Sequence, residues 1–127
     1  MDFGTTMKDR ITLYRPLSQE GISFLLKARF KAFNPNLGAQ NFFYPLTSYH
    51  WARRLAREWS RLSHQETGLA EFRVPYSFIE GFERFEFDGS GYSEYRVPAA
   101  QMVALNNAML DDIQLLETYP ARPVAAD

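Results

Sequence analysis

The sequence predicts a single α+β domain with a largely antiparallel sheet. Its 127 residues suit one domain, and hydrophobic residues make up 46% of them, which is enough to fill one core. Strand-like and helical segments follow one another without the regular alternation of a parallel βαβ sheet. We expect the domain to span residues 10–119, between a flexible leader at 1–9 and a flexible tail at 120–127.

The first half of the chain is predicted to begin with a strand and a helix. Residues 10–17 alternate as a strand does, and Pro16 limits it because proline cannot donate a ladder hydrogen bond. Ser18 has the position of a helix N-cap. The helix that follows has its apolar residues on one side: Ile22, Leu25 and Leu26. A short strand at 30–33 and an aromatic strand at 42–44 come next, separated by a loop of turn-forming residues.

The clearest helical periodicity lies in residues 49–62, after a cap at Thr47 or Ser48. One side of this helix carries an apolar stripe that we expect in the core: Trp51, Leu55, Trp59 and Leu62. Another side carries an arginine stripe: Arg53, Arg57 and Arg61. A solvent-exposed face explains the arginine stripe as well as contact with phosphate does, because the net charge of the chain is only −1.

The second half of the chain is predicted to be mostly strands. In order, we expect a strand at 69–74, a helical turn at 75–82, strands at 83–87 and 92–97, a helix at 99–110 and a strand at 112–119. Asp88, Gly89, Ser90 and Gly91 are turn formers that would join the middle two strands. In the strand at 83–87, alternation places Phe85 and Phe87 on one face, which we expect to point inward.

Composition and charge exclude several classes of function. The chain has no cysteine, so disulfides, thiol catalysis and cysteine-ligated metals are excluded. His50 and His64 are too far apart along one helix to share a metal, and no glycine-rich phosphate loop precedes a helix. The near-neutral charge makes nucleic acid an unlikely partner. With neither a signal peptide nor an apolar run of about 20 residues, we expect a cytoplasmic protein without membrane contact.

Two charged residues occupy strands where apolar ones would be expected. Arg15 falls on the same face of its strand as Ile11 and Leu13, and Glu94 lies between Tyr92 and Arg96 on the other strand. If the two strands lie close together, Arg15 and Glu94 line one cleft. The alternative is an ordinary ion pair, either between these two residues or with Arg96 and Glu117.

These segments resemble a group of small bacterial proteins whose names refer to ADP-ribosylation. The resemblance rests on Leu-Tyr-Arg-Pro at 13–16, Phe-Lys-Ala-Phe at 30–33, Phe-Tyr-Pro at 43–45 and Glu-Tyr-Arg-Val-Pro at 94–98. Their element order is similar to that of the ADP-ribosyltransferase fold. The resemblance implies a split, mostly antiparallel sheet with two to three flanking helices and an NAD cleft between its halves.

The resemblance also implies a role for each matching residue. Glu94 matches the catalytic glutamate, which stabilises an oxocarbenium-like state of the nicotinamide ribose. Arg15 matches the residue that holds the NAD phosphate or ribose, and an aromatic ring stacks against the nicotinamide. The implied cofactor-binding residues are Arg15, Tyr14, Phe43, Tyr44 and Tyr92, with NAD as the substrate and no metal.

The expected function is therefore NAD-dependent transfer of ADP-ribose to an unknown acceptor. The chain departs from the family where Phe42-Phe43-Tyr44-Pro45 replaces a Ser-Thr-Ser pattern, and Tyr92 replaces a second acid, which disfavours arginine as the acceptor. The alternative is an inactive binding or regulatory module on the same fold, acting on a protein target or cognate inhibitor. A nucleic-acid modifier that uses the arginine stripe is a third hypothesis.

Overall fold

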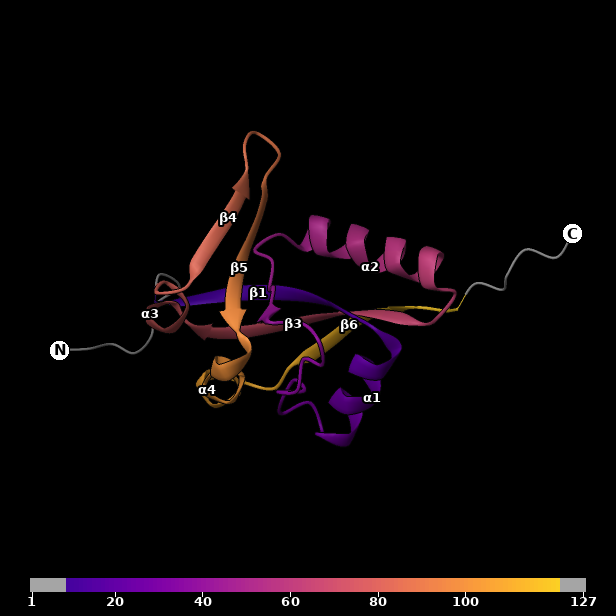
Figure 1. Ribbon diagram of the computed structural model, residues 1–127, viewed down its shortest axis with the longest axis horizontal. Coiled ribbons are helices and arrows are strands. Elements are labelled where there is room, and N and C mark those ends of the chain that lie inside the picture. Colours follow the sequence, from indigo (N-terminus) through magenta and orange to yellow (C-terminus); the bar gives the residue numbers. More distant parts are fainter. Residues whose placement is uncertain (1–8, 122–127) are drawn as a thin grey trace, which may run out of the picture.

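The computed structural model describes residues 9–121 and consists of two antiparallel three-stranded sheets and four helices (Figure 1). In the first sheet the order is β1 (Arg10–Leu17), β3 (Thr67–Pro75) and β6 (Gln114–Tyr119). In the second it is β2 (Phe42–Phe43), β5 (Tyr92–Pro98) and β4 (Glu83–Phe87). The predicted α+β class with antiparallel pairing is confirmed. Most of the predicted leader and tail, residues 1–8 and 122–127, lies outside the described residues.

Four helices flank the sheets, where two to three were expected. They are α1 (Gln19–Lys27), α2 (Tyr49–Ser63), the single turn α3 (Tyr76–Ile79) and α4 (Met102–Ala108), which a 3₁₀ turn (Ala99–Gln101) precedes. Ser18 caps α1 by accepting from the Gly21 amide, and Ser48 caps α2 by accepting from the Trp51 amide. Helices α1 and α2 lie on opposite sides of the first sheet (Figure 1).

A connecting segment, residues 45–47, joins the two sheets. Leu46 lies opposite Tyr14 of β1 on one side and opposite Glu94 of β5 on the other. Two hydrogen bonds link Leu46 to Tyr14, while Thr47 donates to Ser93 and Tyr95 donates to Pro45. Leu46 therefore lies between β1, which carries Arg15, and β5, which carries Glu94.

The main hydrophobic core fills the space between the sheets, α1 and α4. The rings of Phe33, Phe43 and Phe72 meet at its centre, with centroid separations of 5.1 Å for Phe33–Phe43 and 5.0 Å for Phe33–Phe72. The loop before β2 is held there by Asn106 of α4, whose side-chain amide donates to the Phe33 carbonyl and accepts from the Phe33 amide. Residues 30–33 are therefore not the predicted strand. Arg29 and Phe30 have φ of 55° and 63°, so the chain turns here.

A second, smaller core lies beneath α2, where the prediction for the apolar stripe was right only in part: Trp51 and Leu55 pack against this core from its margin, and Leu62 does not. The residues of α2 that face the sheet are small ones four apart, Ala52, Ala56 and Ser60. Small side chains let the helix backbone approach β1 and β3 closely, and Thr67 donates a 2.6 Å hydrogen bond to the Ala56 carbonyl. Trp51, Leu55 and Trp59 are only partly buried, and Leu62 is exposed.

The hairpin of β4 and β5 projects from the body of the molecule (Figure 1). Every residue of β4 is exposed, so the prediction that Phe85 and Phe87 point inward was wrong: these side chains are 43% and 63% exposed. The physical reason is that β4 is the edge strand of its sheet and lies in a hairpin that projects from the body of the molecule. Leu26 of α1 is likewise exposed rather than buried.

Candidate functional site

Arg15 lies where the two sheets part, near the end of β1. Its guanidinium donates to the Tyr44 carbonyl at 3.2 Å. It also lies over two aromatic rings, 5.2 Å from the centroid of Phe43 and 5.3 Å from that of Trp59. Such cation–π contacts stabilise a cation without neutralising it. The guanidinium therefore keeps its full charge in an apolar setting.

The electrostatic setting of Arg15 is unusual for an arginine. Burial lowers its pKa from 12.5 to about 10, against the opposing effects of Glu94, Tyr92 and Tyr44. Arg15 remains a cation at neutral pH, yet within residues 9–121 it forms no ion pair with a carboxylate. The alternative of an ordinary ion pair is thus not what the structure shows, because Arg96 pairs with Glu83 and Glu117 pairs with Arg53.

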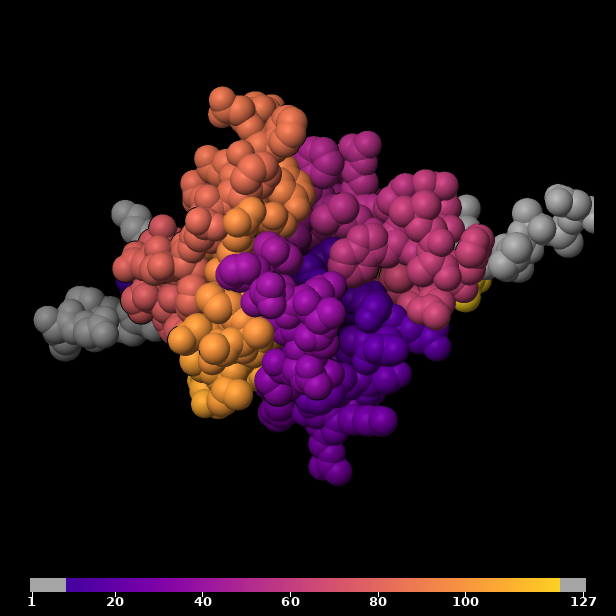
Figure 2. Space-filling model, in the orientation of Figure 1, coloured from indigo at the N-terminus to yellow at the C-terminus, as the bar shows by residue number. Residues whose placement is uncertain are grey.

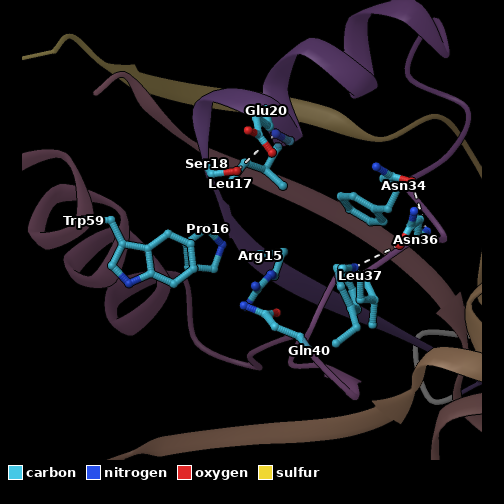
Figure 3. A pocket seen from close by; sticks show the side chains of 14 residues that line it. Arg15, Pro16, Leu17, Ser18, Glu20, Asn34, Asn36, Leu37, Gln40 and Trp59 are labelled. Atoms are coloured by element: carbon cyan, nitrogen blue, oxygen red, sulfur yellow. Dashed lines mark hydrogen bonds between the residues drawn. The ribbon is translucent and has the colours of Figure 1, made fainter. Parts of the chain in front are cut away.

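A first hollow of about 430 Å³ lies on one side of the guanidinium (Figure 3). Trp59 forms one end, Asn34 and Asn36 form the other, and Arg15 and Gln40 lie between them. The loop at the far end is shaped by its own side chains, since Asn34 accepts from the Asn36 amide and Asn36 accepts from the Gly38 amide. The lining of this hollow combines polar side chains with the rings of Phe33, Phe43 and Trp59.

A second hollow of about 540 Å³ also borders the guanidinium and is lined by both predicted charged residues, Arg15 and Glu94. Its remaining walls come from the segment around β2, from α2 and from β5: Gln40, Asn41, Phe42, Tyr44, Leu46, Leu55, Trp59 and Tyr92. Arg15, Gln40 and Trp59 line both hollows, so the two adjoin at the guanidinium. In the space-filling view, indigo β1 is visible at the base of a depression between the purple segment and magenta α2 (Figure 2).

Glu94 is held in place by its neighbour on the same face of β5. The Tyr92 hydroxyl donates to the Glu94 carboxylate at 2.7 Å. Burial, together with this hydrogen bond, raises the pKa of Tyr92 well above its usual value, so the tyrosine stays protonated and remains the donor. The Tyr92 ring packs edge-on against Trp51 of α2, with centroids 5.6 Å apart. Glu94 thus has a fixed orientation at the wall of the second hollow.

The structure brings together five of the six predicted site residues. Arg15, Tyr44, Tyr92 and Glu94 line the second hollow, and Phe43 lines the first. Tyr14 lines neither. It lies on the opposite face of β1 from Arg15, where its ring meets Tyr49 edge-on at 5.9 Å, and burial and Glu71 raise its pKa.

Two residues that line both hollows, Gln40 and Trp59, were not among the site residues predicted from the sequence. Gln40 lies in a loop without any periodic signal. Trp59 was assigned to the core because it shares a stripe with Trp51, but Ala52, Ala56 and Ser60 form a tighter stripe beside it. A row of small residues at helical spacing was the signal for the closely packed face.

The other charged groups are mostly neutralised or exposed. On α2, Arg53 pairs with Glu117 and Arg61 with Glu58, so the arginine stripe is partly balanced. His50 and His64 are exposed, and the described part of the chain has no group of three or more side chains suited to a metal. None of the helices in residues 9–121 combines the length and apolar character that a membrane span requires.

Comparison with protein-family models, curated proteins and solved structures finds no match to this chain. The geometry of the two hollows and the charges that line them are therefore the basis for a function.

Proposed function

We propose that the chain binds NAD between its two sheets and transfers ADP-ribose from it to an acceptor. The observation that supports this most is the Arg15 guanidinium, a partly buried cation without a carboxylate partner among the described residues, at the shared wall of two adjoining hollows. A pyrophosphate is the group that such a cation accommodates best, because its oxygens accept charge-assisted hydrogen bonds. Each hollow has a volume within the usual range for ligand sites, about 300–1,000 Å³.

The arrangement suits a ligand with an anionic centre and a flat group on either side. Arg15 takes the pyrophosphate, one half of the dinucleotide occupies the first hollow and the other half occupies the second. Aromatic rings line both, with Phe43 and Trp59 in the first and Tyr44 and Tyr92 in the second, where they support stacking of a planar ring. We place the nicotinamide ribose in the second hollow, because Glu94 lies there.

Glu94 is the proposed catalytic residue. When the bond between nicotinamide and ribose breaks, its electron pair leaves with neutral nicotinamide and positive charge develops on the ribose. A fixed carboxylate stabilises that charge more in the transition state than in the ground state. The acceptor then attacks the ribose carbon and loses its proton. Tyr92 is a positioning residue, since its hydroxyl orients the carboxylate at 2.7 Å.

The second candidate function is that of a regulatory module, which binds the same nucleotide but does not transfer ADP-ribose. Two observations favour it: Tyr92 occupies the place of a second acid, and the chain lacks the Ser-Thr-Ser pattern beside β2. Binding and chemistry are separable, so one set of measurements decides between the two functions.

The test combines calorimetric titration with measurement of nicotinamide release by the purified chain and its Glu94→Gln variant. Transfer predicts that both proteins bind NAD and that only the unmodified chain releases nicotinamide. Binding without release by either protein favours the regulatory module. If neither NAD nor ADP-ribose binds, the nucleotide proposal is wrong, and equal release by both proteins removes Glu94 from the mechanism.

A further inference from the structure

The outer edge of β4 is an unpaired strand edge. β4 is the last strand of the order β2-β5-β4, and no other strand within residues 9–121 continues the sheet beyond it. All five of its residues are exposed, and its hairpin stands clear of the outline of the molecule (Figure 2). Such an edge presents free backbone donors and acceptors to another strand.

The hydrogen bonds of β5 show which residues of β4 face that edge. Ser93 and Tyr95 bond to the connecting segment, so the backbone of Glu94, between them, points to β4. Glu94 lies opposite Phe85 in the register. The backbone groups of Phe85 therefore point to β5, and those of its neighbours Arg84 and Glu86 point to the open edge.

These two outward residues make the edge complementary to itself. In an antiparallel pair of β4 strands centred on Phe85, Arg84 of each copy lies opposite Glu86 of the other. Both pairs are of the hydrogen-bonded kind, which gives four backbone hydrogen bonds, and the two Phe85 rings face one another across the centre. We propose that β4 pairs with β4 of a second copy of this chain in this register.

The neighbouring registers that keep the same backbone pairing are disfavoured by charge. Shifting the centre to Arg84 places two arginines opposite each other, and shifting it to Glu86 places two glutamates opposite each other. Charges on an edge strand usually oppose pairing. In β4 the two charges, Arg84 and Glu86, have opposite signs and lie two residues apart, and they form an ion pair within the strand. The pattern thus selects one register instead of blocking them all.

Contacts with the rest of the molecule fix the position of the hairpin. Trp51 of α2 donates from its indole nitrogen to the Ser90 carbonyl in the turn, at 3.0 Å. The Phe85 ring packs edge-on near Tyr92, with centroids 6.4 Å apart. Opposed residues of an antiparallel pair share a face, so the Glu94 residues of the two copies lie on the same face of the joined sheet.

The test is sedimentation equilibrium of the full chain, with two charge-reversal variants. The pairing predicts a mass that rises from 14.7 kDa towards twice that value as concentration increases, over a range of about 10 µM to about 1 mM for so small an interface. Arg84→Glu alone and Glu86→Arg alone each oppose like charges and stay monomeric. An equimolar mixture of the two variants restores every opposite pair and associates again.

Two results overturn the proposal. One is a monomer at the highest concentration of the unmodified chain, and the other is a dimer that persists in both single variants. Amide exchange gives a second readout, because the amides of Arg84 and Glu86 become protected only in the associated form. Neither measurement depends on nucleotide binding, so the proposal stands or fails separately from the proposed function.

Discussion

Replacing Arg15 with methionine should abolish NAD binding while leaving the free energy of unfolding nearly unchanged. Methionine keeps an apolar side chain of similar length and removes the charge. Burial lowers the pKa of Arg15 from 12.5 to about 10, and at about 1.4 kcal/mol per pKa unit the buried charge costs at most about 3.5 kcal/mol. Arg15 is only partly buried, so solvent screening reduces this cost to about 1–2 kcal/mol.

The favourable contacts of Arg15 are of similar size. The hydrogen bond to Tyr44 is long at 3.2 Å and contributes about 1 kcal/mol. The two cation–π contacts contribute about 0.5 kcal/mol each at a partly exposed site. The cost of burying the charge and the gain from these contacts nearly cancel. We therefore expect Arg15→Met to change the free energy of unfolding by less than about 1 kcal/mol, or about 4 °C in melting temperature for a chain of this size.

The assay is thermal unfolding with and without NAD. At a ligand concentration of about 100 times Kd, binding stabilises the native state by about 2.7 kcal/mol, or about 10 °C. We expect this shift in the unmodified chain and in the control Arg57→Met, which removes an exposed arginine from α2, but not in Arg15→Met. A loss of about 3–5 kcal/mol in Arg15→Met without ligand would refute the reasoning, because that is the cost of breaking a buried ion pair. A retained shift with NAD would remove Arg15 from the binding site.

Three further predictions follow from packing and titration. Phe72→Ala deletes a fully buried ring and should lower the free energy of unfolding by about 3–5 kcal/mol in urea, whereas Phe87→Ala, at an exposed position, should change it by less than about 0.5 kcal/mol. Ala56→Leu overfills the contact of α2 with the first sheet and should cost about 1–3 kcal/mol; an unchanged urea midpoint would contradict that packing. Hydrogen bonds from Tyr119 and Tyr49 lower the pKa of Glu117, so its stabilising effect is present above about pH 4.5 and is lost as the pH falls below it. Acid titration of Glu117→Gln should therefore show a smaller loss of stability in this range, and an unchanged acid profile would contradict the assignment.

The positions and pairing type of the strands were predictable because alternation is a local property. The stretch from Ser93 to Val97 predicts that Ser93, Tyr95 and Val97 share one face, and these three are the buried ones. The cap at Ser18 was likewise predictable, because the capping hydrogen bond involves residues only three apart.

Alternation does not show whether a face is covered, which explains the errors at Phe85 and Phe87. Nothing in residues 83–87 reveals that their strand lies at an edge. The candidate site likewise depends on contacts between residues that are far apart in the sequence. The sequence placed Arg15 and Glu94 on separate strands, but it gave no sign that Leu46 lies between them or that Trp59 of α2 completes the wall. Residues that meet through tertiary packing alone leave no local signal.

The connecting segment sets how the two sheets lie relative to one another. Leu46 is the residue through which the two sheets are continuous, and four backbone hydrogen bonds at residues 45–47 carry the junction. The spacing between the guanidinium on β1 and the carboxylate on β5 is therefore a property of this joint and not of either sheet. Leu46 is buried at this joint and also lines the second hollow. Substitutions at Leu46 should therefore change both the gap between the opposite charges and the affinity for a ligand.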